Sequence, residues 1–129
     1  FYRLFGVFIY MKGSIIWSIQ RYSSLFIFAY FIYIVSFFII SDEINFSIWS
    51  NFFLSYKVRA FTTITFLMIV AHSYVGLWTV GTDYLTERTL GFLNKSLAKR
   101  AGLLRNLYFI VFTILGILYL MGILYIIWL

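Results

Sequence analysis

The chain has 129 residues, of which 64% are hydrophobic and only 11% are charged, and its mean hydropathy is +0.98. An ordinary soluble domain carries about 25% charged residues, so this composition cannot cover a water-soluble globule with polar surface. The net charge of +6 fits the basic residues that membrane proteins concentrate on one side, and we expect no nucleic-acid partner. The absence of cysteine excludes disulfides, thiolate metal sites and iron–sulfur ligation by this chain.

The N-terminal segment, residues 1–21, is apolar but carries Arg3 and Lys12. Its uninterrupted apolar stretch, residues 4–11, is too short to cross a bilayer. We therefore expect this segment to lie along the lipid headgroups or to pack under partner subunits. Because the chain begins with Phe1 rather than Met, we also expect a processed or incomplete start.

Three charge-free windows follow, at residues 22–40, 60–80 and 107–129. Each is about long enough to cross a hydrocarbon core of ~30 Å at 1.5 Å per residue. We predict an all-α membrane protein that consists of one membrane-anchor domain, residues 1–129, with three transmembrane helices at residues 22–40, 58–80 and 107–129. Three spans are too few to enclose a large transport pathway alone, so we expect a partner or an oligomer to complete the helical bundle.

The loop at residues 86–106 is basic and places apolar residues at three- and four-residue spacing, which is typical of an amphipathic helix on a membrane surface. We interpret this loop as a contact with anionic lipid, and a specific docking surface is the alternative. Of the ten basic residues, only Lys57 and Arg59 lie in the loop between the first two spans. The positive-inside rule therefore places the N-terminus and the 86–106 loop in the cytoplasm or matrix. The expected location is an inner membrane, either bacterial or mitochondrial.

His72 is the only histidine, and it lies near the middle of the second span. An ionisable group at that depth usually faces the interior of a helical bundle. It acts there either as a ligand or proton carrier, or as a neutral group that hydrogen-bonds to another helix. Gly76 lies one turn further on, where the missing side chain permits the close approach of either a flat macrocycle or another helix. Both residues belong to a stripe on one helix face that also contains Thr65, Thr79 and Asp83.

Polar groups also gather at the cytoplasmic ends of the first two spans. Asp83 lies at a helix C-terminus, where the macrodipole disfavours a negative charge by about 0.3–1 kcal/mol, so we expect a compensating cation or a function. Tyr84 is either an aromatic-belt residue or a hydrogen-bond donor to a quinone carbonyl. Arg21, just before the first span, either snorkels to the headgroups or pairs with a buried carboxylate. Ser23 and Ser24 follow it and suit both interpretations.

The run from His72 to Tyr84, HSYVGLWTVGTDY, closely resembles the second-helix signature of one of the two succinate dehydrogenase hydrophobic membrane anchor families. That signature reads His-x-x-x-Gly-[Leu/Met]-Trp-x-Val-x-Thr-Asp-Tyr. The spacing from Arg21 to Trp49 is also similar, with one phenylalanine pair before a short acidic loop and another after the tryptophan (Phe37, Phe38, Phe52 and Phe53). The resemblance covers approximately residues 21–85, whereas the third span matches in hydrophobic character alone.

The resemblance implies a role for each matching residue. His72 would be one axial ligand of a haem b that is shared with the companion anchor, the second hydrophobic chain of such a complex, which supplies the other histidine. Tyr84 would hydrogen-bond ubiquinone near the iron–sulfur subunit, and Asp83 would support that site. Arg21 would lie near the haem propionates. We count Ser24 and Gly76 as further candidate cofactor contacts.

The function implied by the resemblance is that of a membrane-anchor subunit of succinate:ubiquinone oxidoreductase (respiratory complex II), which is not catalytic alone. Its partners would be the companion anchor, the iron–sulfur subunit, the flavoprotein subunit and membrane lipid. The chain departs from the pattern at Ile15 and Ile16, where relatives often carry a His-Asp pair, and in the longer 86–106 loop. The alternatives are an accessory subunit of a respiratory complex and a homodimeric b-type cytochrome in which two copies of His72 share one haem.

Overall fold

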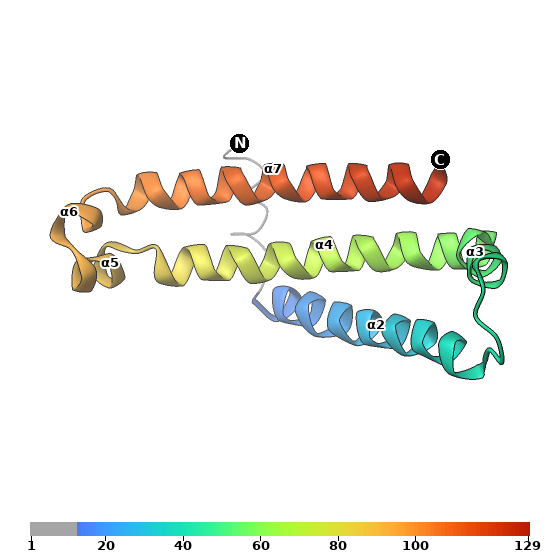
Figure 1. Ribbon diagram of the computed structural model, residues 1–129. Helices are drawn as coiled ribbons and strands as arrows, with labels where there is room; N and C mark the ends of the chain where they lie inside the picture. The colour runs from blue at the N-terminus through green and yellow to red at the C-terminus, as the bar shows by residue number, and fades with distance from the viewer. Residues whose placement is uncertain (1–12) are drawn as a thin grey trace.

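The computed structural model describes residues 13–129, and the regular elements in that range are all helices (Figure 1). In chain order these are α2 (Gly13–Ile40), α3 (Phe46–Leu54), α4 (Tyr56–Tyr84), α5 (Glu87–Leu93), α6 (Lys95–Ala98) and α7 (Ala101–Trp128). The three long helices, α2, α4 and α7, are each long and apolar enough to cross a membrane. The predicted all-α fold with three transmembrane helices is therefore confirmed.

The long helices extend beyond the predicted spans. With 28 or 29 residues each, they are about 42 Å long and exceed a hydrocarbon core of ~30 Å. α2 begins at Gly13, so residues 13–21 of the predicted interfacial segment are its first turns, and residues 1–12 lie outside the described residues. Counting charges misses such ends because a helix can continue through a charged residue such as Arg21.

The loop predicted at residues 86–106 forms two short helices, α5 and α6, and its last residues belong to α7. The break falls at Asn94, whose backbone is extended and whose side-chain oxygen accepts a hydrogen bond from the Ser96 N–H at 2.7 Å. Asparagine is a favoured N-cap because its side chain satisfies an N–H that has no partner within the helix. The cap therefore starts a new helix where the apolar spacing alone predicts a continuous one.

The connection between the first two spans contains α3, a helix that the sequence did not lead us to expect. Asn45 caps its N-terminus by accepting a hydrogen bond from the Ile48 N–H at 2.9 Å. The rings of Phe37 in α2 and Phe52 in α3 stack with their centroids 3.8 Å apart and an interplanar angle of 9°. The two phenylalanine pairs of the sequence thus meet and hold α3 against the end of α2.

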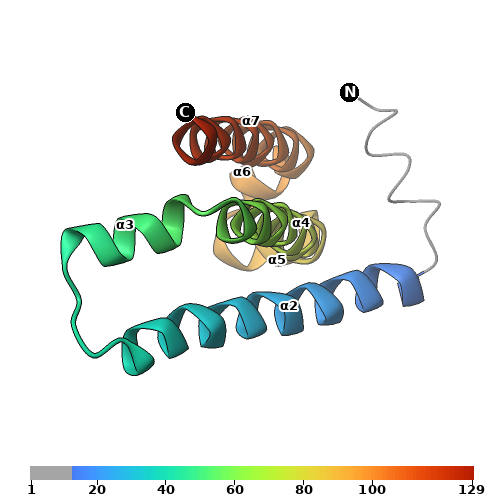
Figure 2. The same cartoon turned by 90° about the vertical axis from the view of Figure 1, so that its right-hand side faces the viewer.

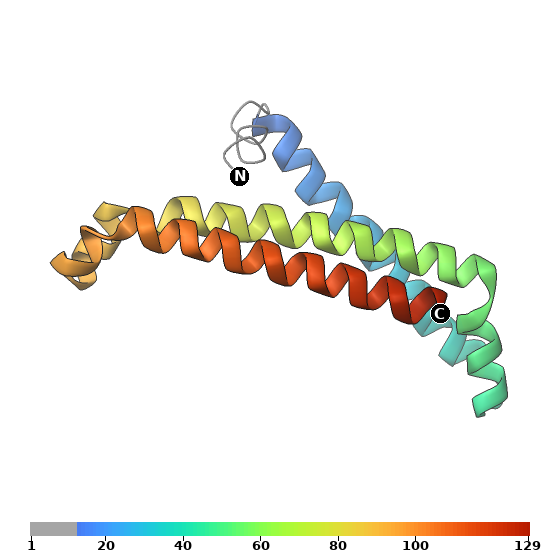
Figure 3. The same ribbon diagram turned by 90° about the horizontal axis from the view of Figure 1, so that it is seen from above.

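α4 is the central helix of the molecule and lies between α2 and α7 (Figure 2). Tyr30 of α2 hydrogen-bonds Thr62 of α4 at 2.7 Å, and the Tyr108 hydroxyl of α7 donates to the Leu77 carbonyl of α4 at 3.1 Å. α2 crosses α4 at an angle, so the N-terminal end of α2 diverges from the other two long helices (Figure 3). The C-terminal part of α4 is consequently packed on α7 and not on α2.

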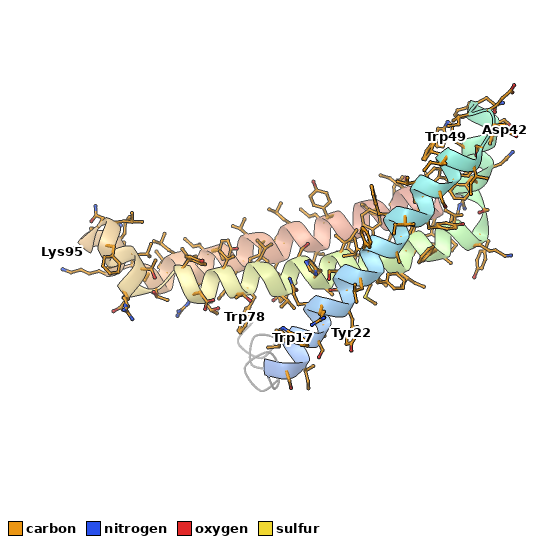
Figure 4. The ribbon with its side chains drawn as sticks, turned by 90° about the horizontal axis from the view of Figure 1, so that it is seen from below. Trp17, Tyr22, Asp42, Trp49, Trp78 and Lys95 are labelled. Carbon is orange, nitrogen blue, oxygen red and sulfur yellow. The ribbon has the colours of Figure 1, made fainter. Side chains whose placement is uncertain are left out.

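The buried core is small, and the buried apolar side chains come mainly from α4 and α7, including Val75, Phe109 and Phe112. Only 6–11% of the most apolar window of each long helix is buried within the chain. Charged residues lie at the two ends of this apolar surface. Lys95 lies at one end of the molecule, and Asp42 lies at the other, near Trp49 (Figure 4). This distribution suits a chain whose outer surface is covered by lipid and by other proteins rather than by water.

Candidate functional site

His72 projects from the middle of α4 toward α2, and both of its ring nitrogens contact that helix. Nδ1 lies 3.0 Å from the Ser23 hydroxyl and 3.1 Å from the main-chain carbonyl oxygen of Gln20. Nε2 lies 3.3 Å from the side-chain amide nitrogen of Gln20. These three residues, which we call the His72 cluster, place the only histidine at the point where α2 crosses α4.

The contacts of Gln20 and Ser23 with His72 were not expected from the sequence. Ser23 is only 2% exposed, and its hydroxyl donates to the Ile19 carbonyl at 2.6 Å. Residues 20 and 23 are three apart and therefore share one face of a helix. This spacing of two polar side chains in an apolar helix is the signal that could have identified them.

The predicted stripe on α4 lies only partly against α2. A Cβ atom added at Gly76 would lie 3.5 Å from the Gln20 amide nitrogen, so Gly76 also faces this residue. Thr65 is 1% exposed and donates its hydroxyl to the Phe61 carbonyl of its own helix. Asp83, in contrast, is exposed, because α2 has diverged from α4 at that level. The structure thus brings His72 and Gly76 together with α2 and leaves the C-terminal end of the stripe open.

Arg21 and Ser24 lie on the exposed side of α2, beside the His72 cluster in sequence but not in contact with the imidazole. The Arg21 guanidinium lies 5.1 Å from the centroid of the Trp17 ring, which is within the range of a cation–π interaction. The Ser24 hydroxyl donates to the Arg21 carbonyl at 2.7 Å. Arg21 is therefore a cation inside a transmembrane helix, close to the level of His72, rather than a residue that precedes the helix.

Asp83 and Tyr84 form a second candidate site at the C-terminal end of α4. The Tyr84 side chain is 63% exposed, and the carboxylate of Asp83 lies 3.5 Å from the Thr82 hydroxyl. Tyr84 is twelve residues beyond His72, which corresponds to about 18 Å along a helix. A single headgroup of a small molecule cannot contact both side chains, so the chain offers two separate sites.

An open hollow of about 590 Å³ between α2 and α4 borders the His72 cluster, and it is lined in part by Ser23, Phe26 and Ala71. A second hollow, of about 300 Å³, lies between α4 and α7 and is lined almost entirely by apolar side chains such as Phe66 and Leu115. The Gln20 side-chain oxygen is buried without a hydrogen-bond partner among the described residues. The His72 cluster is thus a polar group beside open space, and one of its acceptors is unsatisfied.

Comparison with known proteins identifies a relative of the chain. The succinate dehydrogenase hydrophobic membrane anchor subunit of Coxiella burnetii is 27% identical over 79 residues, which cover 61% of this chain and 69% of that protein. The resemblance predicted from the sequence is confirmed. No protein-family profile matches the chain.

Together with the three apolar spans, this likeness to a membrane anchor identifies a multi-pass protein of an inner or cytoplasmic membrane. Within residues 13–129, no group of three or more histidine, cysteine or acidic side chains is arranged to hold a metal ion. His72 is the side chain at membrane depth that could supply a single ligand to a metal-containing cofactor.

Proposed function

We propose that the chain is a membrane-anchor subunit of succinate:ubiquinone oxidoreductase. The similarity to a succinate dehydrogenase membrane anchor carries this proposal, and the three spans with little internal burial support it. In this role the chain attaches a flavoprotein subunit and an iron–sulfur subunit to the membrane together with a companion anchor. Because the chain has no cysteine, the iron–sulfur clusters of such a complex must belong to another subunit.

His72 is the residue that would hold a haem b in this complex. When bound, a haem b would supply one-electron transfer, and imidazole nitrogens are suited to hold its iron. The chain has one histidine, so a second histidine ligand would have to come from the companion anchor. The imidazole suits this role because it lies at membrane depth and has its Nδ1 held by α2.

Three residues near the His72 cluster would be further contacts of this group. The Arg21 guanidinium is a permanent cation and is suited to a propionate carboxylate. The Ser24 hydroxyl lies on the same turn of α2, and Gly76 has no side chain of its own one turn from His72. Their contribution is to bind and orient the group rather than to react.

Tyr84 and Asp83 are the residues of this chain that would contact ubiquinone. The Tyr84 hydroxyl is exposed at the end of α4, where it can donate a hydrogen bond to a quinone oxygen. This oxygen gains negative charge as the quinone is reduced, so the donated hydrogen bond strengthens during the reaction and favours reduction. Asp83 adds a carboxylate at the same end of the helix.

The proposal is tested by purifying the complex in mild detergent through a tag on this chain. We expect flavoprotein and iron–sulfur subunits to co-purify with a b-type haem spectrum. Partners without haem would indicate an accessory subunit instead, and haem without partners would indicate a homodimeric cytochrome.

Two substitutions in the assembled complex test the two sites separately. His72→Ala should remove or shift the reduced-minus-oxidised haem spectrum, whereas Thr79→Ala on the same helix should leave it unchanged. Tyr84→Phe should lower quinone reduction more than electron transfer from succinate to an artificial acceptor. Tyr56→Phe, at the opposite end of α4, is the matched control. An unchanged spectrum in His72→Ala, or equal losses in both assays for Tyr84→Phe, would contradict the assigned roles.

A further inference from the structure

The contacts of His72 with α2 determine which ring nitrogen carries the proton. A main-chain carbonyl oxygen can only accept a hydrogen bond, and the Gln20 carbonyl lies 3.1 Å from Nδ1. An unprotonated Nδ1 would place its lone pair against the lone pairs of that oxygen. Nδ1 therefore carries the hydrogen, and Nε2 carries the lone pair.

The Ser23 hydroxyl fits the same arrangement. Its short hydrogen bond to the Ile19 carbonyl, 2.6 Å, uses its one proton, so its oxygen is free to accept from the Nδ1–H at 3.0 Å. Ser23 is almost fully buried, which keeps water from replacing either contact. Two acceptors on α2 thus hold one N–H of His72.

The side-chain amide of Gln20 lies at the opposite edge of the ring. Its nitrogen is 3.3 Å from Nε2 and donates to the lone pair that a metal would otherwise use. In this position the amide leaves its own oxygen buried and without a partner among residues 13–129, which is unfavourable. Gly76 provides the space in which the amide lies. The amide is therefore a weakly held cap, because one of its two polar ends is unsatisfied.

We propose that Gln20 and Ser23 are positioning residues for the ligand nitrogen of His72. Ser23 and the Gln20 carbonyl fix the ring with Nε2 unprotonated, and the Gln20 amide covers Nε2 until a metal displaces it. The role of the amide rests on the proposed binding of haem by His72, whereas the tautomer follows from the contacts alone. Hydrogen bonding of the second ring nitrogen is the usual way in which proteins orient a histidine ligand and raise its basicity.

The tautomer is tested on the full-length chain in lipid nanodiscs, labelled with ring-¹⁵N histidine. Since His72 is the only histidine, the spectrum contains one pair of ring signals. We expect a protonated Nδ1 and an unprotonated Nε2, and Ser23→Ala should reduce the fraction of this tautomer whereas Ser36→Ala should not. A protonated Nε2 in the unsubstituted chain would overturn the proposal.

The effect on the metal is tested in the assembled complex. Ser23→Ala should retain haem but raise its midpoint potential, because a less basic imidazole stabilises ferric iron less, and Ser23→Thr should restore the original value. Gln20→Leu removes the amide that competes for Nε2. The haem-depleted complex should therefore take up haem about two- to tenfold faster, or bind it about two- to tenfold more tightly, because one competing hydrogen bond is lost.

These results separate the two proposals. If His72→Ala abolishes the haem spectrum while Ser23→Ala leaves the midpoint potential unchanged, the positioning role is wrong and the proposed function stands. Loss of haem in Gln20→Leu would show that Gln20 retains the haem, and it would overturn the role as a cap. If His72→Ala leaves the spectrum unchanged, haem binding by this chain and the role of the cap are both overturned.

Discussion

Gly81 is the position at which an added methyl group should most disturb the packing of α4 on α7. A Cβ atom at Gly81 would overlap Cε1 of Phe109, and it would lie 2.9 Å from Cζ of the same ring and 3.0 Å from Cδ1 of Tyr108. Phe109 is only 7% exposed and packs edge-to-face on Phe112, with the centroids 5.7 Å apart, so its ring cannot simply rotate away. Gly81→Ala should therefore force the two helices apart.

The expected change in stability of Gly81→Ala results from two opposing effects. Overpacking of a closely packed site costs about 1–3 kcal/mol. Replacing glycine by alanine in a helix gains up to about 1 kcal/mol in propensity. Gly122→Ala is the matched control, because a Cβ atom at Gly122 of α7 would have no neighbour within 4 Å. The propensity gain cancels between the two variants, so Gly81→Ala should be less stable than Gly122→Ala by about 1–3 kcal/mol.

The assay is equilibrium unfolding of the full-length chain in mixed dodecylmaltoside–SDS micelles, followed by tryptophan fluorescence. Phe109→Leu in the Gly81→Ala background should recover part of the loss, because the smaller side chain leaves room for the methyl group. The reasoning is refuted if Gly81→Ala is as stable as Gly122→Ala, since α7 would then not pack closely on α4 at this level.

Three further predictions concern the contacts between helices, the α3 cap and the orientation in the membrane. Tyr30→Phe should lower the free energy of unfolding by about 0.6 kcal/mol in the same assay. It should cause no further loss in a variant that already carries Thr62→Val, because both substitutions remove the same interhelical hydrogen bond. Asn45→Ala should destabilise α3 by about 0.5–2 kcal/mol through loss of its N-cap, seen as faster amide hydrogen exchange in α3 but not in α7. In right-side-out vesicles, Ser47→Cys should react with a membrane-impermeant maleimide and Ser96→Cys should not, against a background free of native cysteine. Labelling of both cysteines, or of the one at position 96 alone, would contradict the predicted orientation.

The sequence predicted the transmembrane helices because a bilayer imposes a strong and simple requirement, about 20 apolar residues in a row. This requirement does not determine where the helices begin and end. α2 begins at Gly13, well upstream of the predicted start at residue 22. A helix can continue through a charged side chain such as Arg21, so the charge-free windows do not mark where a helix starts or stops. α3 was missed for a related reason, since its start is a local cap at Asn45 rather than a long apolar pattern.

The candidate site was predictable in part. His72 was evident as a lone ionisable group at membrane depth, and Tyr84 and Asp83 were evident from the motif that they complete. The contact with Gln20 and Ser23 was not predictable, because it joins residues about fifty positions apart and depends on the angle at which α2 crosses α4. No periodicity along one helix encodes a crossing angle, which is set by the side chains of both helices at the point of contact.

The central position of α4 determines which helices can unfold independently of one another. α2 and α7 are each held by α4 and make little contact with each other, so detaching one need not release the other. When two helices pack on a third but not on each other, they can belong to separate cooperative units, and each unit unfolds locally with its own free energy. Loosening α7 by substitution at Gly81 should accordingly speed amide exchange along α7 while the backbone of α2 around Ser23 keeps its protection. The His72 cluster belongs to the unit formed by α2 and α4, and its geometry survives the local release of α7.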